Sequence, residues 1–118
     1  MTARLLNAAV MPREGIYHLR QITPAEFARL VDQQKPVSYI GYHNAAVVLS
    51  RLCNCQIAIN RESTPMEDGD YLLIARLKYR VGNPAAKGQV EATVHDYEFF
   101  ECLYEARVPI WDFQRGRE

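Results

Sequence analysis

The spacing of apolar residues changes at Gly41, and this change organises the prediction for the whole chain. Residues 36–40, with the sequence PVSYI, are rich in β-forming side chains and predict a buried strand that ends at Gly41. Beyond Gly41 the apolar residues recur with the 3.6-residue period of an α-helix. The residues on that helix face are Ala45, Ala46, Leu49, Leu52 and Cys53. Asn54, which tolerates the left-handed conformation, is predicted to end the helix.

An earlier helix is predicted from its start signal. Thr23 is expected to be the N-cap, Pro24 the first helical residue and Glu26 the partner in a capping box. The apolar residues that follow at helical spacing are Phe27, Leu30 and Val31. Pro36 ends this helix, because the residue before a proline avoids the α region.

Five other segments have the composition of strands. Residues 4–11 and 15–22 are expected to pair as a hairpin, and residues 56–61 to form a short strand after the second helix. Residues 70–80 predict a long strand with Leu72 and Ile74 on one face and Leu73, Ala75 and Leu77 on the other. Residues 98–108 are rich in aromatic side chains, which favours a strand over a helix.

This order of elements predicts an α/β fold. We expect a mixed β-sheet of about five strands with flanking helices, in a single domain that spans residues 1–118 and ends in a tail over residues 109–118.

Composition narrows the classes of function. The chain has 118 residues and carries 14 basic and 14 acidic side chains, so it lacks the basic excess that binding to extended DNA or RNA requires. No apolar run approaches the ~18 residues of a membrane span, and no membrane partner is expected. Only three cysteines are present, which argues against a disulfide framework and favours a cytoplasmic protein.

Cysteine and histidine spacing predicts no metal site, and the sequence has no Walker or Rossmann glycine pattern, so no cofactor is expected. Cys53 and Cys55 lack the second ligand pair of a structural zinc site, so small core positions are expected for both. His18, His43 and His95 show no ligand spacing either. His18 is expected to be an exposed or hydrogen-bonded strand residue.

The turn after Gly41 is the predicted functional site. A strand that enters a helix through glycine leaves free backbone N–H groups, which with the helix dipole form an anion site. Tyr42, His43 and Asn44 place three hydrogen-bonding side chains there. A helix-capping role for His43 has about equal weight with a functional one. Asn7 is more simply read as a strand-end residue bonded to backbone than as part of a pocket rim.

Histidine titrates near neutral pH, so this turn has the parts for phosphodiester cleavage without a metal. In that reaction a ribose 2′-hydroxyl attacks the adjacent phosphate and an acid protonates the 5′-oxygen. The possible phosphate partners are Arg61, Arg76, Lys78 and Arg80. The last three lie at the basic end of one face of residues 70–80. This end is either an ordinary solvated edge or a basic lip over an anionic ligand.

Taken together, the motifs resemble a known family, the small viral and bacterial proteins known as anti-CRISPR ring nucleases of type III systems. The matching segments, over residues 4–105, are Leu5-Leu6-Asn7-Ala8, Ser38-Tyr39-Ile40-Gly41-Tyr42-His43, Asn60-Arg61, the turn Glu67-Asp68-Gly69-Asp70 into a strand that ends at Arg80, and Tyr97-Glu98-Phe99.

The resemblance implies a function and a partner. Proteins of that family form symmetric homodimers that bind a cyclic oligoadenylate, cyclic tetra-adenylate, across the two-fold axis and cleave it without metal. A viral origin would place this chain in the host cytoplasm. The implied ligand-binding residues are Asn7, Gly41, Asn44, Arg80 and Asn83, and the implied catalytic positions are His43 and Tyr42. The aromatic segment around Phe99 and Phe100 is expected to contribute to the dimer contact.

Two departures from the family pattern keep alternatives open. Tyr42 occupies the position of the family's catalytic histidine, and His43 lies one residue later. No glutamate follows Arg80 in the sequence VGNP. Two other functions are therefore retained: a non-catalytic sponge for the same class of ligand, and a structural or interaction module that kept only the fold. A different ring size or a different nucleotide is also compatible with these residues.

Overall fold

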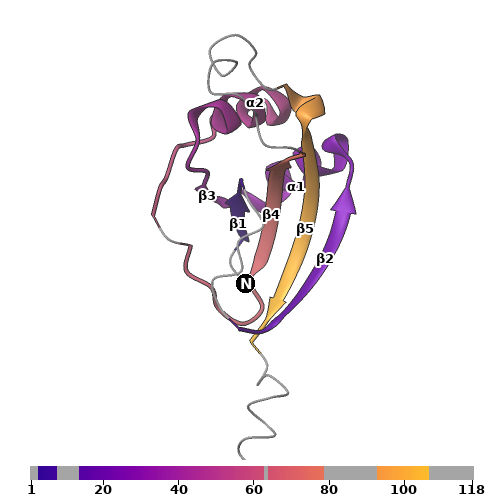
Figure 1. Cartoon of the computed structure of the whole chain (residues 1–118), viewed down its shortest axis with the longest axis vertical. Coiled ribbons are helices and arrows are strands. Elements are labelled where there is room, and N and C mark those ends of the chain that lie inside the picture. The colour runs from indigo at the N-terminus through magenta and orange to yellow at the C-terminus, as the bar shows by residue number, and fades with distance from the viewer. Residues whose placement is uncertain (1–2, 8–13, 63, 79–92, 107–118) are drawn as a thin grey trace, which may run out of the picture.

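The computed structural model describes residues 3–7, 14–62, 64–78 and 93–106, which form a five-stranded mixed sheet with two α-helices (Figure 1). The elements are β1 (Ala3–Leu6), β2 (Ile16–Ile22), α1 (Pro24–Gln34), β3 (Val37–Tyr39), α2 (His43–Cys53), β4 (Tyr71–Leu77), the 3₁₀-helix η2 (Val94–Asp96) and β5 (Tyr97–Glu105). The predicted α/β class with a five-stranded mixed sheet is confirmed. Arg80, Asn83 and the predicted tail over residues 109–118 lie outside the described residues.

The sheet has the strand order β2-β5-β4-β1-β3. Strand β1 is parallel to both β3 and β4, whereas β5 is antiparallel to both β4 and β2. The carboxyl ends of β1, β3 and β4 therefore meet at one edge of the sheet, where α2 is also found (Figure 1). In open α/β sheets this is the edge at which ligands usually bind.

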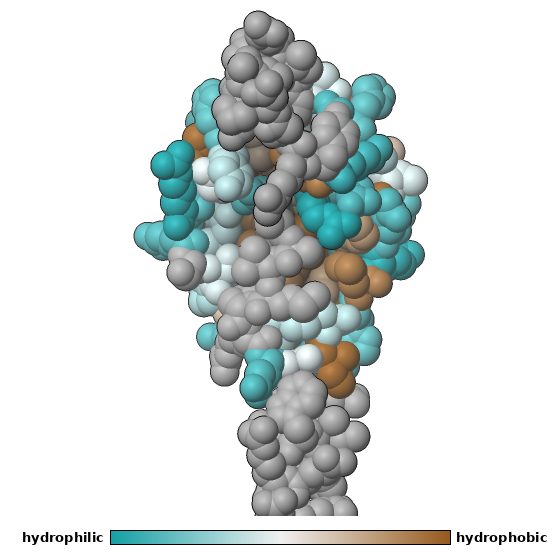
Figure 2. Space-filling view, in the orientation of Figure 1, coloured by the Kyte–Doolittle hydropathy of each residue, from teal (hydrophilic) through white to brown (hydrophobic). Residues whose placement is uncertain are grey.

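The sheet buries apolar side chains on both faces. The face that packs on the helices holds Leu5, Leu73, Ala75 and Phe99, which contact the buried helix residues Phe27, Val31, Ala45, Ala46 and Leu49. The opposite face holds a second cluster made of Leu6, Met66, Leu72, Ile74, Cys102 and Tyr104. The predicted alternation along β4 is thus confirmed, because Leu72 and Ile74 belong to one cluster and Leu73 and Ala75 to the other. On the face drawn in Figure 2, apolar side chains reach the surface mainly toward β2.

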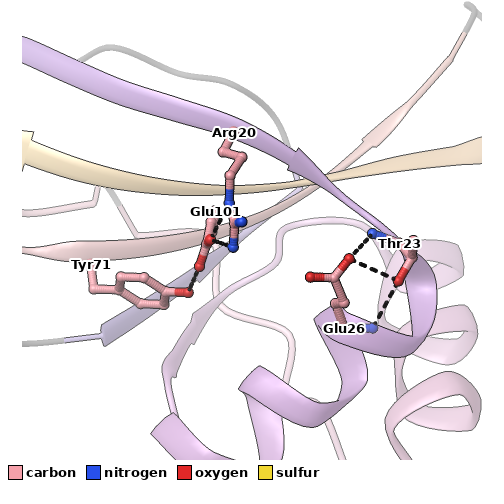
Figure 3. Close-up of polar contacts among 5 residues, drawn as sticks. All are labelled: Arg20, Thr23, Glu26, Tyr71 and Glu101. Carbon is pink, nitrogen blue, oxygen red and sulfur yellow. Dashed lines mark hydrogen bonds and ion pairs between the residues drawn. The ribbon is translucent and has the colours of Figure 1, made fainter.

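The start of α1 follows the predicted capping box. The Glu26 N–H donates to Thr23 Oγ1 at 3.1 Å, and Glu26 Oε1 accepts from the Thr23 N–H at 3.3 Å (Figure 3). The end of α2 also follows the prediction, since Asn54 adopts the left-handed conformation with φ of 50°. None of the helices in the described ranges is long and apolar enough to cross a membrane.

The predicted hairpin between the first two strands is wrong. Strand β2 pairs along its whole length with β5, from Ile16 opposite Glu105 to Ile22 opposite Phe99. Strand β1 lies instead between β3 and β4, where its Leu5 and Leu6 are buried on opposite faces. A short apolar strand of this kind suits the centre of the sheet, whereas the mostly exposed β2 suits an edge.

The predicted strand over residues 56–61 reduces to one bridge between Ile40 and Ile59. Side chains satisfy the neighbouring backbone instead: Ser38 Oγ donates to the Ala58 carbonyl at 2.6 Å, and Asn60 Nδ2 donates to the Ser38 carbonyl at 3.0 Å. These bonds fasten the segment to β3 without a regular ladder.

Three burial expectations also need correction. Strand β3 is not buried on both faces, because it is the last strand of the sheet and Val37 is 50% exposed. Cys55 is exposed, since it lies beyond the end of α2, whereas Cys53 packs against the core as expected. Phe99 is 1% exposed inside the core, so it offers no surface to a dimer partner.

A buried ion pair joins the two central parallel strands. Arg4 of β1 donates through Nη1 to Asp70, the residue that precedes β4, and the two residues are only 6% and 2% exposed. Asp70 Oδ2 also accepts the Glu67 N–H at 2.7 Å. The same carboxylate therefore holds the neighbouring turn and the register between β1 and β4.

We expect Asp70→Asn to lower the free energy of unfolding by about 3–5 kcal/mol, because it leaves the Arg4 charge buried without a counter-charge. Arg4→Met should be damaging for the reciprocal reason. The double variant should lose much less than the sum of the two single losses, as urea denaturation would show. Asp32→Asn, which breaks the exposed pair with Lys35, is the control and should change little. Additive losses would contradict a direct dependence between Arg4 and Asp70.

A second polar cluster ties β2, β5 and β4 together on the helix-covered face (Figure 3). The Tyr71 hydroxyl donates to Glu101 Oε2, and Arg20 donates to Oε1 through Nε at 2.6 Å and through Nη2. The Tyr71 hydroxyl and the Arg20 guanidinium hold the pKa of the Glu101 carboxyl below its ordinary value. Burial, aided by the bond to Glu101, raises the pKa of Tyr71.

These two shifts predict the pH dependence of stability. The lowered pKa of Glu101 contributes stability above the unfolded value of about 4.3, and this contribution is lost as pH falls through the folded pKa. The raised pKa of Tyr71 contributes stability below about 10, and this is lost as pH rises through the folded pKa. Glu101→Gln should therefore flatten the acid side of a plot of urea midpoint against pH, and Tyr71→Phe should flatten the alkaline side.

The matched control is Glu98→Gln, which removes the other cross-strand carboxylate bonded to an arginine, Arg76. It should cost less stability near neutral pH than Glu101→Gln, because Glu101 uses one oxygen for Arg20 and the other for Tyr71, and a glutamine keeps only one acceptor oxygen for these two donors. An acid side of the plot that Glu101→Gln leaves unchanged would contradict the assigned role of Glu101.

Candidate functional site

The predicted site is built around the Gly41 turn, where three separate parts of the chain meet. The Gly41 N–H donates to Asn7 Oδ1 at 3.2 Å, and Arg61 Nε donates to the Gly41 carbonyl at 3.0 Å. Asn7 follows β1 and Gly41 follows β3, so both lie at the carboxyl edge of these parallel strands. The structure thus brings together Asn7 and Gly41, two of the implied ligand-binding residues, which lie 34 positions apart in the sequence.

Helix α2 begins at this turn without a side-chain cap. Tyr42 is the N-cap residue, in an extended conformation with φ of −113° and ψ of 131°, and no side chain caps the helix in the described part of the chain. The Ala46 N–H is the first to bond back into the helix, to the Tyr42 carbonyl at 3.1 Å. The preceding N–H groups are left at the positive end of the helix dipole.

The two predicted catalytic side chains both extend from this helix start. Tyr42 is 69% exposed, and His43 is exposed as the first residue of the helix. His43 therefore does not occupy the N-cap position that a pure capping role would give it. Both side chains are accessible to a ligand above the turn.

Asn44, the next residue of α2, is held by a tyrosine that the sequence analysis did not include among the site residues. The Tyr97 hydroxyl donates to Asn44 Oδ1 at 3.3 Å. Tyr97 is 4% exposed, and its burial raises its pKa, so the hydroxyl keeps its proton as a donor. No spacing rule joins a helix residue to a strand residue 53 positions away, so the sequence carried no signal for this contact.

Arg61 reaches Gly41 because the segment before it is fastened to β3. The Asn60 N–H donates to the Ile40 carbonyl at 2.8 Å, and Asn60 Nδ2 donates to the Ser38 carbonyl. Arg61 was one of several possible phosphate partners in the sequence. Its contact with Gly41 now places it beside the uncapped start of α2.

The other described basic candidates are Arg76, whose charge is partnered, and Lys78, whose side chain is exposed. Arg76 donates to Glu98 and lies with Cζ 5.2 Å from the centre of the Phe100 ring, so its charge is already partnered. Lys78 lies just beyond the carboxyl end of β4, and its backbone N–H donates to the Asp96 carbonyl at 2.9 Å. The continuous basic lip that was considered for this strand face is therefore interrupted at Arg76.

His18 takes the role expected of it. It belongs to β2, its side chain is 53% exposed, and its Nε2 lies 3.1 Å from Glu105 Oε1. In the described ranges, no three histidine, cysteine or acidic side chains gather as ligands for a metal ion. The chemistry that the described site offers is hydrogen-bond donation: backbone N–H groups, two asparagine amides, one arginine and one histidine.

Comparison with known proteins gives this chain a family. The family described as STIV B116-like matches residues 3–101. "Uncharacterized protein 26" of Sulfolobus islandicus filamentous virus (isolate Iceland/Hveragerdi) is 30% identical over 98 residues, which is 80% of this chain and 80% of that protein.

Among solved structures, B116 of Sulfolobus turreted icosahedral virus superposes with a TM-score of 0.65 at 19% identity, covering 86% of this chain and 98% of that one. This likeness shows a shared fold, and both relatives are viral proteins. The chain belongs to the STIV B116-like family of small viral domains.

Proposed function

We propose that this protein binds a cyclic oligoadenylate, cyclic tetra-adenylate in particular, and cleaves it, which would switch off type III CRISPR signalling. The observation that supports this most is the convergence on Gly41. Asn7 bonds its N–H, Arg61 bonds its carbonyl, and the uncapped start of α2 follows directly. Such a cluster of donors suits the negative charge of a phosphodiester.

Arg61 strengthens the case for phosphate because of how it is held. Its Nε is occupied by the Gly41 carbonyl, whereas its terminal nitrogens have no acceptor within the described residues. This bond directs the guanidinium toward the turn and leaves its outer N–H groups for a ligand. The planar guanidinium fork suits two phosphate oxygens better than a point charge does.

The proposed reaction needs only positioning, charge neutralisation and proton transfer. The 2′-oxygen attacks the adjacent phosphorus and loses its proton, to solvent or to a base. The bond between phosphorus and the 5′-oxygen breaks, and an acid gives that oxygen a proton. The products are a 2′,3′-cyclic phosphate and a 5′-hydroxyl. His43 is the proposed acid, and Tyr42 is the alternative because it occupies the same exposed helix start.

The cleavage assay would use the purified protein with cyclic oligoadenylates of several sizes in the presence of a chelator. If His43 is the acid, His43→Ala should lower the single-turnover rate by ~10²–10⁴-fold with little change in affinity. If Tyr42 is the acid, Tyr42→Phe should be the damaging change. His18→Ala, which alters an exposed histidine of β2 away from the turn, should leave the rate unchanged.

The other outcomes separate the remaining functions. Binding without cleavage in the wild type would replace the nuclease by a sponge, and Tyr42→His should then create or raise activity. No binding of any ring would leave only a structural or interaction module. Full activity in the double variant Tyr42→Phe, His43→Ala would remove both side chains from proton transfer.

We further propose that the protein acts as a symmetric homodimer. A cyclic ligand with repeated units is itself symmetric and suits a site on a two-fold axis. Two exposed side chains lie at the Gly41 turn and offer apolar area for such a contact. They are Tyr42, which follows Gly41, and Ile59, which bridges to Ile40, at 69% and 45% exposure. Of the aromatic pair expected at the contact, Phe99 is buried, whereas Phe100 is only partly buried and stays an expected contact residue.

Sedimentation should therefore show a dimer at tens of micromolar, the order of concentration at which typical interfaces are occupied. Ile59→Lys should shift the population toward monomer, because it places a charge in the contact beside the turn. Leu19→Lys is the matched control: Leu19 is similarly exposed, at 48%, but lies on the opposite edge strand β2. A monomeric wild type would contradict the proposal.

A further inference from the structure

Three asparagines lie around the Gly41 turn, and they use their amide groups differently. Asn60 is bonded at both ends, since Nδ2 donates to the Ser38 carbonyl and Oδ1 accepts the Glu62 N–H, each at 3.0 Å. Asn7 and Asn44 are bonded only through Oδ1. Their Nδ2 groups have no acceptor within the described residues, and both side chains are partly exposed.

At Asn7 the donor opposite Oδ1 fixes which way the amide faces, and at Asn44 the structure directs Oδ1 toward the tyrosine hydroxyl. A backbone N–H can only donate, so Gly41 must meet the oxygen of Asn7 and not its nitrogen. A tyrosine hydroxyl both donates and accepts, but here it donates to the oxygen of Asn44. In both cases the oxygen is occupied inside the protein and the two N–H donors of the amide are left over.

Tyr97 is itself firmly positioned. It is the first residue of β5 and pairs with Leu77 of β4, and it follows η2 directly. Within η2, Asp96 accepts the Thr93 N–H at 2.7 Å, and its carbonyl accepts the Lys78 N–H. A buried hydroxyl held in this way needs an acceptor, and Asn44 Oδ1 supplies it.

We propose that Tyr97 is a positioning residue that turns the Asn44 amide so that it presents donors, as Gly41 does for Asn7. The site would then select a ligand through hydrogen-bond acceptors, such as the oxygens of a phosphodiester, and reject one that presents donors. This role rests on the function proposed above, and it adds a residue that does not touch the ligand.

The test combines Tyr97→Phe and Asn44→Ala with calorimetric titration of cyclic tetra-adenylate. Tyr97→Phe keeps the buried ring and removes only the hydroxyl, and it should weaken binding by about fivefold, the order of one hydrogen bond. In the Asn44→Ala background the same change should have no further effect, because Tyr97 acts through Asn44. Tyr71→Phe removes another partly buried tyrosine hydroxyl, far from the turn, and should leave the affinity unchanged.

Asn44→Asp adds a readout that a merely structural role would not produce. The aspartate side chain still accepts from Tyr97 but offers no donors and carries a negative charge, so binding should be weaker than in Asn44→Ala. The comparison of Asn44→Asp with Asn44→Ala can be made even if Tyr97→Phe does not fold. Equal or tighter binding by Asn44→Asp would overturn the assignment of a donor at this position.

The remaining outcomes distinguish this role from the proposed function. If the wild type binds the ring but Tyr97→Phe binds equally well, or the two changes are additive, the role of Tyr97 is wrong and the function stands. If the wild type binds no ring, the function fails and the role in ligand selection fails with it. In that case the NMR resonance of the Asn44 side-chain amide is compared between the ligand-free wild type and ligand-free Tyr97→Phe. A change in its chemical shift shows that the hydrogen bond exists.

Discussion

The buried ion pair between Arg4 and Asp70 is the constraint on which the geometry of the site depends. It joins β1 to the residue before β4 and so supports the register in which Leu5 lies opposite Leu73. A slip of one residue would exchange the two faces of β1 and bury polar surface in one of the cores. It would also displace Asn7, which follows β1 directly and bonds the Gly41 N–H. A pair buried at one end of the sheet thus helps to fix the site at the other end.

Local signals in the sequence were sufficient for the helices and the central strand. The capping box at Thr23 and the left-handed residue Asn54 are interactions within a few residues, so they can be read without knowledge of the fold. The alternating faces of β4 are equally local. Strand pairing is not: the hairpin was expected because adjacent strands often pair, but β2 found its partner in β5, about eighty residues later.

The candidate site likewise has a local part that the sequence indicates and long-range contacts that it does not indicate. Gly41, Tyr42, His43 and Asn44 are consecutive, so the change of period from strand to helix was enough to single them out. The contacts that organise them come from other parts of the chain: Asn7 after β1, Arg61 beside β3 and Tyr97 at the start of β5. These contacts follow from strand order and register, which are set by the packing of the whole sheet. The sequence therefore indicated the turn but not the residues from other segments that bond to it.

The two helices begin differently, and the helix without a side-chain cap is the one at the proposed site. Helix α1 begins with a complete capping box, in which side chains accept the Glu26 N–H and the Thr23 N–H. Helix α2 contributes more buried residues to the same core, yet Tyr42 gives it no side-chain cap. A good N-cap typically stabilises a protein by ~1 kcal/mol, so its omission here has a cost in the free protein. A bound phosphate would satisfy the same groups, and a ligand that binds only the folded state stabilises it in proportion to the logarithm of its concentration. Exceptions to local rules are expected where a structure serves a ligand as well as its own stability.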